Sequence, residues 1–106
     1  MSTSYRRYEL LLPRRYNDGR RIPNRFITET LLEWREQFGA ASCETQTIRG
    51  QWQHEGEVYQ DEQVRLFVDV EDTAGNRQFF MEFKERAKIR FQQIELWLTS
   101  HPIDLL

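Results

Sequence analysis

The sequence has 106 residues, of which 39% are hydrophobic and 13% aromatic, and its formal net charge is −2. This length suits one domain with its own core, and so many aromatic residues exclude an intrinsically disordered chain. The single cysteine, Cys43, excludes an internal disulfide, and three consecutive leucines before Pro13 are too few for a signal peptide or membrane span. We therefore expect one cytoplasmic domain over residues 1–106, with no membrane association.

Charge is distributed unevenly along the chain. Residues 1–25 hold seven arginines against two acidic residues, a balance of +5, whereas the remaining 81 residues hold eight basic and fifteen acidic residues, a balance of −7. Such a division predicts complementary contacts, within the fold, between subunits or with an anionic partner.

The first elements are a strand and a helix joined by a long loop. Tyr5–Leu12 reads as a strand with apolar residues on both faces, ended by Pro13, and Asn17-Asp18-Gly19 predicts a turn within loop 13–24. The helix is predicted over Arg25–Phe38, because Ile27, Leu31, Trp34 and Phe38 form an apolar stripe of helical period. Gly39 is expected to end it in the left-handed conformation.

A strand hairpin is predicted next. Ala40–Gln53 reads as a polar edge strand, and a two-residue turn at Glu55-Gly56 returns the chain along Val58–Glu71. This register pairs Trp52 with Tyr59, Ile48 with Gln63 and Glu44 with Phe67. It also places Cys43, Thr45 and Thr47 opposite Val68, Leu66 and Val64.

The second half of this hairpin organises the domain. Val64, Leu66, Val68 and Val70 alternate with Arg65, Phe67 and Asp69, which is typical of a strand with one buried face. A second helix is then predicted, capped by Asp72-Thr73, with a buried stripe of Phe80, Phe83, Ala87 and Phe91. A final strand is predicted over Gln93–Thr99, with Ile94, Leu96 and Leu98 facing inward and Pro102 beyond its end.

The order β-α-β-β-α-β with right-handed crossovers predicts an α+β ferredoxin-like sandwich. It has a four-stranded antiparallel sheet with both helices on one face. We expect the strands at Tyr5 and Val64 to be central and parallel to each other, with the other two at the edges.

The sheet face away from the helices is the first candidate functional surface. By alternation it carries Leu11, Trp52, Tyr59, Phe67 and Trp97 among charges of both signs. Aromatic anchors among paired charges are typical of an interface or ligand site. We favour self-association as a homodimer, with another protein or a small ligand as the alternative occupant, and a covering tail or loop as the non-functional explanation.

The second candidate surface is the arginine-rich loop, with Arg14, Arg15, Arg20 and Arg21 around the predicted turn. Guanidinium groups bind phosphate and carboxylate in a bidentate manner. The alternative is that these arginines pair with the acidic remainder of the chain or stay solvated. The loop has only one glycine, so it does not form a glycine-rich phosphate cradle.

Catalytic and metal-binding patterns are weak. His54 and His101 have no partner nearby in the sequence at metal-ligand spacing, and the acids near the hairpin, Glu55 to Glu62, are typical of a solvated tip. No nucleophile lies in a recognisable turn motif. We predict no catalytic residues, no metal site and no cofactor.

Three short stretches resemble a known group of proteins. Arg15-Tyr16-Asn17-Asp18-Gly19, Gly50-Gln51-Trp52 and the hairpin from Glu55-Gly56 to Glu62 are similar to small uncharacterised bacterial ferredoxin-like proteins, domains of unknown function. The resemblance implies the fold and no activity.

Three functions remain as hypotheses. The first is a non-enzymatic module that self-associates through its aromatic sheet face and binds a partner or small ligand. The second is a small enzyme with a pocket between paired sheets, for which Arg7, Glu9 and His101 are the residues to test. The third, nucleic-acid binding through the arginine loop, is disfavoured because Arg7, Glu9 and Leu11 of the first strand include no base-stacking aromatic and Asp69 and Glu95 would repel phosphate.

Overall fold

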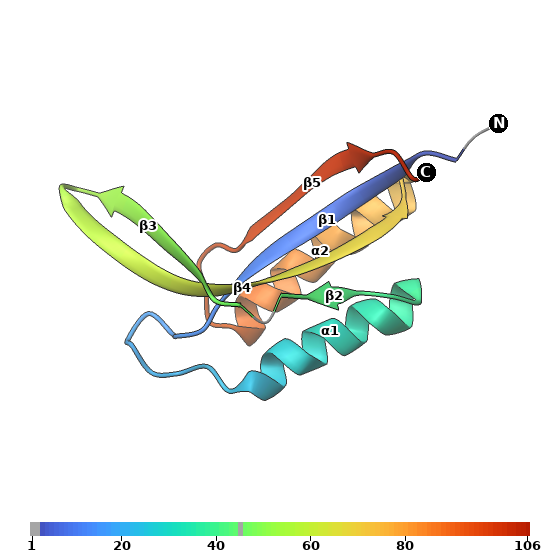
Figure 1. The fold of residues 1–106 in the computed structure, drawn as a ribbon. Helices are drawn as coiled ribbons and strands as arrows, with labels where there is room; N and C mark the ends of the chain where they lie inside the picture. The colour runs from blue at the N-terminus through green and yellow to red at the C-terminus, as the bar shows by residue number, and fades with distance from the viewer. Residues whose placement is uncertain (1–2, 45) are drawn as a thin grey trace.

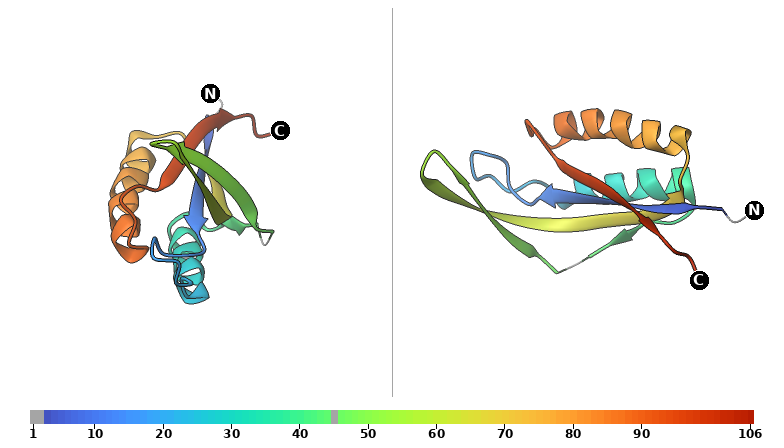
Figure 2. Two further views of the ribbon diagram at one scale, coloured as in Figure 1. Left: turned by 90° about the vertical axis from the view of Figure 1, so that its left-hand side faces the viewer. Right: turned by 90° about the horizontal axis from the view of Figure 1, so that it is seen from above.

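The structure, a computed structural model, describes residues 3–44 and 46–106. Its elements in chain order are β1 (Tyr5–Pro13), α1 (Asn24–Phe38), β2 (Ser42–Cys43), β3 (Ile48–His54), β4 (Glu57–Glu71), α2 (Ala74–Arg90) and β5 (Trp97–Ile103). The sheet runs β2-β4-β1-β5, and β3 pairs with the other half of β4 (Figure 1). Both helices lie on one face of the sheet, which confirms the α+β sandwich (Figure 2).

The expected parallel pair at the centre of the sheet is wrong. β1 and β4 are antiparallel, with Tyr8 opposite Val68 and Leu10 opposite Leu66. Each β-α-β crossover skips one strand, so the two strands it connects are parallel but not adjacent. Every neighbouring pair in the described sheet is therefore antiparallel.

The predicted edge strand Ala40–Gln53 is two strands, which gives five strands in place of four. The hairpin register is confirmed, because Trp52 pairs with Tyr59 and Ile48 with Gln63. Beyond the interruption, Ser42 and not Glu44 lies opposite Phe67, and Cys43 lies opposite Leu66 and not Val68. The two extra residues preserve the strand's parity, so Cys43 keeps its predicted place on the valine face. Thr45 lies outside the described residues, and Thr47 falls in the connection before β3.

The last strand is displaced from its prediction. It spans Trp97–Ile103, so Pro102 lies inside it, opposite Arg6. β5 has only one neighbour, and an edge strand tolerates proline. Ile94 is 90% exposed in the preceding loop, whereas Leu96 is buried as expected.

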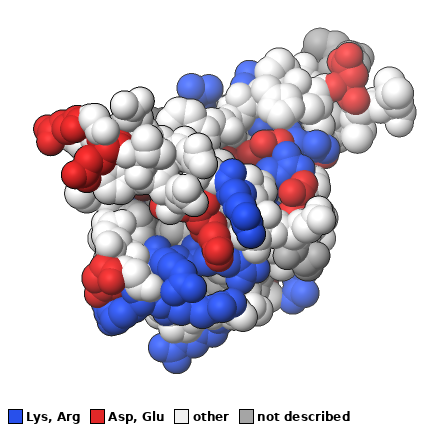
Figure 3. Space-filling view, turned by 60° about the vertical axis from the view of Figure 1, so that its left-hand side comes forward, with Lys and Arg blue, Asp and Glu red and all other residues white. Residues whose placement is uncertain are grey.

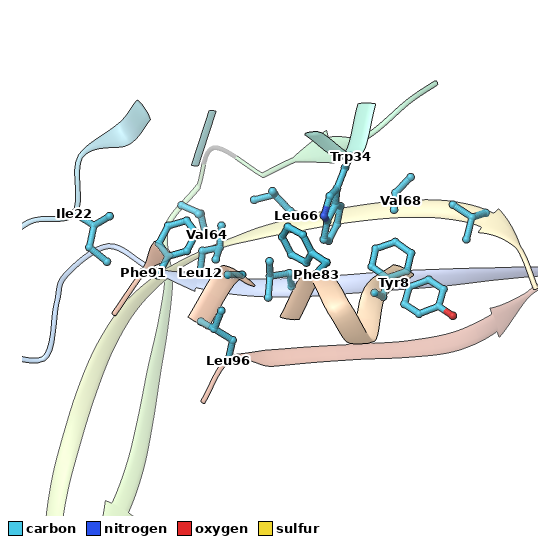
Figure 4. Packing of buried hydrophobic residues seen from close by; sticks show 14 residues of the cluster. Tyr8, Leu12, Ile22, Trp34, Val64, Leu66, Val68, Phe83, Phe91 and Leu96 are labelled. Atoms are coloured by element: carbon cyan, nitrogen blue, oxygen red, sulfur yellow. The ribbon is translucent and has the colours of Figure 1, made fainter. Parts of the chain in front are cut away.

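The core lies between the sheet and the helices. Val64, Leu66, Val68 and Val70 of β4 are all at most 5% exposed, which confirms the buried face of this strand. Both helical stripes pack against them, and Trp34, Phe83 and Phe91 are fully buried (Figure 4). The predicted helix ends are also observed. Thr73 caps α2 by accepting a hydrogen bond from the Asn76 N–H, and Gly39 ends α1 at φ +83°.

The β3–β4 hairpin extends beyond the two-layer body (Figure 1). β4 is 15 residues long, and only its second half, from Val64, is covered by the helices. The first half pairs with β3, and only its last residue, Gln63, also pairs with β1. The molecule is consequently elongated, with extents of 50 × 29 × 25 Å. Neither helix of the described chain is long and apolar enough to cross a membrane.

Candidate functional site

The open sheet face, defined by the outward residues of β1, β4 and β5, carries charges at its centre. Arg7 donates two hydrogen bonds to the carboxylate of Asp69 on β4, at 2.7 and 3.0 Å. Arg65 contacts Glu9 at 3.2 Å and also Glu44. The charges of both signs are thus paired across neighbouring strands, a cross-strand arrangement that stabilises a sheet.

Phe67 lies between the two arginines of this network. Its ring centre is 4.9 Å from the Arg7 guanidinium and 5.0 Å from that of Arg65, so both make cation–π contacts. The hydrogen bonds from Arg7 hold the pKa of Asp69 below its usual value, and the same partnership raises the pKa of Arg7. The centre of the face is therefore a charged, internally partnered surface.

Apolar exposure is concentrated at one end of the open face. Leu11 and Trp97 lie directly opposite each other on β1 and β5. Trp97 is 66% exposed, whereas Leu11 is half-buried beside it. An indole this exposed, next to a partly exposed leucine, is typical of an interface anchor.

The hairpin carries a second aromatic group. Trp52 and Tyr59 stack with their ring centres 4.3 Å apart, and the indole N–H of Trp52 donates to Asp61 at 2.8 Å. These contacts hold both rings in fixed positions, although Trp52 is 49% and Tyr59 39% exposed. The hairpin therefore presents a preorganised aromatic surface.

A large cleft lies between the hairpin and the body of the domain. Its volume is about 1050 Å³. It has three sides: residues 59–63 with Arg49 and Trp52 from the hairpin, the end of β1 and the following loop, and the segment 93–97 that leads into β5. The side at β1 consists of Pro13, Arg15, Tyr16, Asn17 and Gly19. Of the predicted sheet-face residues, Trp52, Tyr59 and Trp97 line it, whereas Leu11 and Phe67 lie outside it. Figure 3 turns the hairpin end of the molecule toward the viewer and shows basic side chains gathered on the lower part of this face.

The arginine-rich loop does not gather its four arginines into one site. A bridge between Arg15 and Arg21 folds the loop into a small hairpin, with Gly19 at φ +90°. Arg20 is paired with Asp18 at 2.6 Å, and hydrogen bonds from the Arg20 backbone and side chain lower the pKa of Asp18. Arg14 lies at the base of the loop, where its backbone N–H donates to Glu62. Of the four, only Arg15 lines the cleft.

The acids of the cleft do not resemble a catalytic pair. Asp61 accepts from Trp52, and Glu95 contacts Lys84 at 2.8 Å. The hydrogen bonds from Lys84 and from the Leu96 N–H hold the pKa of Glu95 below its usual value, so it is ionised at neutral pH. In the described ranges, no group of three or more histidine, cysteine or acidic side chains could hold a metal ion.

The residues proposed for an enzyme lie on the open face. Arg7 and Glu9 belong to its ion-pair network. His101 lies on β5, directly opposite Arg7 of β1 in the strand register. None of the three lines the cleft. Sequence reasoning missed the cleft itself: turn signals mark two of its sides, but residues 93–96 read as a strand, so the third side had no signal.

No protein-family model and no curated protein matches this sequence. Several solved structures share the fold, and two of them illustrate it. One is a phage SAM lyase in complex with S-methyl-5′-thioadenosine, with a TM-score of 0.69 and 10% identity, over 99% of this chain and 93% of that one. The other is CutA1 from Oryza sativa, with a TM-score of 0.64 and 13% identity, over 99% of this chain and 84% of that one. At these identities the likeness shows the fold alone.

Proposed function

We propose that this protein is a self-associating module that binds a small planar ligand in the cleft. The observation that carries the proposal is the lining of the cleft, where the stacked Trp52–Tyr59 pair and the exposed Trp97 share one space with Arg15 and Arg49. Ligand sites are concave and largely apolar, with a few polar groups that fix orientation. The aromatic side chains of the cleft can stack on a heteroaromatic ring of a ligand, and the neighbouring guanidinium groups can donate hydrogen bonds to its polar substituents.

The ligand class we infer is a nucleoside or a related compound. The faces of indole and phenol rings stack on any base, and the guanidinium groups and Asp61 supply donors and acceptors for its edges and sugar. The phage SAM lyase of the same fold holds S-methyl-5′-thioadenosine, an adenine nucleoside. That likeness is one of fold, and it supports the choice of adenosine and S-methyl-5′-thioadenosine as first probes.

Calorimetric titration with these two nucleosides tests the ligand. We expect saturable binding, which Trp52→Ala weakens roughly 5- to 150-fold, because stacking of a base on an aromatic ring contributes about 1–3 kcal/mol. Trp52→Phe keeps a ring and is expected to retain most of the affinity. Val58→Ala is the matched control, since Val58 is 62% exposed on the same hairpin but does not line the cleft.

Absence of binding of both nucleosides at millimolar concentration would contradict the proposed ligand. Binding that Trp52→Ala leaves unchanged would place the ligand elsewhere on the protein.

Self-association is supported by the open face. Trp97 is 66% exposed, so most of its apolar surface is not buried within a single chain. The hairpin extends away from the body, and the helices cover neither of its faces (Figure 2). Light scattering over a range of concentrations measures the mass in solution. We expect a mass above that of one 12.9 kDa chain. A single-chain mass at every concentration would overturn this half of the proposal.

A small enzyme is the second candidate, and it uses the same cleft. The observation that favours it is Glu62, which lines the space where a ligand would stack and whose carboxylate, unlike those of Asp61 and Glu95, has no partner among the described side chains. Chromatography of the nucleosides after prolonged incubation with the protein distinguishes the two functions. Unchanged ligand indicates a binding module, and a new product that requires an intact cleft indicates an enzyme.

A further inference from the structure

A second, smaller pocket lies between α2 and β5. Its volume is about 190 Å³, and it shares no lining residue with the cleft. Its polar walls include Tyr8, Arg77, Lys84 and Ser100, and its apolar walls include Met81 and Leu98. The pocket is thus formed by one helix and the two strands β1 and β5, which are rigid parts of the fold.

The hydroxyl of Tyr8 has no protein partner. Tyr8 is only 4% exposed, and its ring stacks on Phe80 with the ring centres 3.9 Å apart. The hydroxyl forms no hydrogen bond with any described residue and is buried, and Tyr8 is one of the residues that line the pocket. Figure 4 shows this oxygen at the edge of the core cluster, pointing away from Phe83 and Leu66. A buried donor without an acceptor is costly, so such a group requires an explanation.

Two cationic side chains, Arg6 and Arg77, and the carboxylate of Asp72 act on this hydroxyl. Arg77 forms no ion pair with any described residue, and its charge acts on Tyr8 together with that of Arg6. Arg6 is held by Asp72 at 3.2 Å and donates to the Ser100 hydroxyl at 3.1 Å. Lys84 lies on the same side of the helix, in contact with Glu95. Arg77 is therefore the cation left free for a ligand among the described residues that line the pocket.

We propose that the pocket between α2 and β5 binds a small carboxylate with a short aliphatic chain. The Tyr8 hydroxyl donates to one carboxylate oxygen and the Arg77 guanidinium pairs with the other, while the chain packs against Met81 and Leu98. The Ser100 hydroxyl, positioned by Arg6, borders the same space.

Size and polarity favour this ligand over larger or more highly charged ones. A volume of about 190 Å³ is below the range of roughly 300–1,000 Å³ that drug-sized ligands occupy. One free guanidinium and a hydroxyl match a single negative charge, whereas a phosphate dianion would lie partly against apolar side chains. Burial raises the pKa of Tyr8, so its hydroxyl remains a donor at neutral pH.

Titration of the isotope-labelled protein with butyrate, followed by NMR, tests the site. We expect saturable shifts of the backbone amides of residues 77–84 and 98–100. Butyramide has the same shape without the charge and is expected to cause no saturable shift. Inorganic phosphate is expected to bind more weakly than butyrate.

Two variants test the residues separately. Tyr8→Phe keeps the stacked ring and removes only the hydroxyl, and Arg77→Gln changes an exposed side chain without a described ion pair. Each is expected to weaken butyrate binding about 10- to 100-fold, the effect of losing one hydrogen bond to a charged group. Arg35→Gln is the matched control, an exposed arginine on α1 that is remote from the pocket lining, and it should bind butyrate as the wild type does.

Thermal unfolding distinguishes a lost contact from a lost fold. Because Tyr8→Phe removes an unpartnered buried hydroxyl, its melting temperature without ligand should equal or exceed that of the wild type. A wild-type affinity in both variants, equal binding of butyramide, phosphate binding at least as tight as butyrate, or no saturable shift would each overturn the proposal. This site does not depend on the cleft, so failure of nucleoside binding leaves it unaffected.

Discussion

Replacing Trp97 with arginine tests whether the open sheet face anchors self-association. The change removes the most exposed aromatic side chain of the face and puts a charge in its place. Trp97 lies on edge strand β5 with its indole directed away from the helices, so the substitution removes no buried contact of the core.

The exposed fraction of Trp97 sets the magnitude. A tryptophan has roughly 150–250 Å² to bury, and Trp97 is 66% exposed. Burial in an interface therefore removes about 100–165 Å² from water, or about 2.5–4 kcal/mol per copy at 25 cal/mol per Å². Losing this contribution once per interface corresponds to an increase in the dissociation constant of roughly 10²- to 10³-fold, and the increase is larger where both copies bury Trp97.

Sedimentation or light scattering over a concentration series measures this constant. The matched control is Ile89→Arg, which places the same charge at an 81% exposed apolar residue of α2, away from the sheet. We expect Trp97→Arg to dissociate the assembly and Ile89→Arg to leave it unchanged. An assembly that persists in Trp97→Arg, or that dissociates equally in both variants, would refute the assignment of this face.

Three further predictions concern the fold and its ionisable groups. Phe83→Ala should lower the free energy of unfolding in urea by about 3–5 kcal/mol, because the ring is fully buried among the helices and sheet. Arg7 lowers the pKa of Asp69 in the folded state. The stabilisation from this pair should therefore be complete above the unfolded-state pKa of about 3.9 and lost as the pH falls through the folded-state value. Unfolding of Asp69→Asn and wild type from pH 7 to pH 2 should show the difference in their free energies of unfolding vanish at low pH. Burial raises the pKa of the Cys43 thiol, so iodoacetamide should alkylate it more slowly in the native protein than in urea, and equal rates would contradict this.

Local patterns in the sequence were enough to predict most of the elements. The period of two in β4 and the apolar stripes of both helices are set by neighbouring residues. The structure buries the predicted side chains of β4 and α2, and it buries Trp34 of α1 with the rest of that stripe partly buried beside it. The turn at Glu55-Gly56 determined the hairpin register, because a two-residue loop allows only one pairing of its strands. Each of these features depends on interactions between residues close together in the chain.

Features that depend on distant residues were the ones predicted wrongly. The position of β5 is set by its pairing with β1, which places Trp97 opposite Leu11, whereas the alternation of Ile94, Leu96 and Leu98 suggested an earlier start. The interruption between β2 and β3 likewise has no local breaker such as proline. The cleft combines three segments from separate parts of the chain, so no single stretch of sequence could reveal it.

The structure changes where on the open face an interface would form. The charges at the centre of the face are already satisfied within one chain, by Arg7 with Asp69 and by Arg65 with Glu9 and Glu44. Burying such pairs costs desolvation without adding new partners. An interface on this face would therefore gain most from burying the apolar surface of Trp97, at the end of the face. This residue also lines the cleft. A ligand that stacks in the cleft and a second copy that covers Trp97 then act on the same side chain, and linkage requires that each changes the affinity of the other by the same factor.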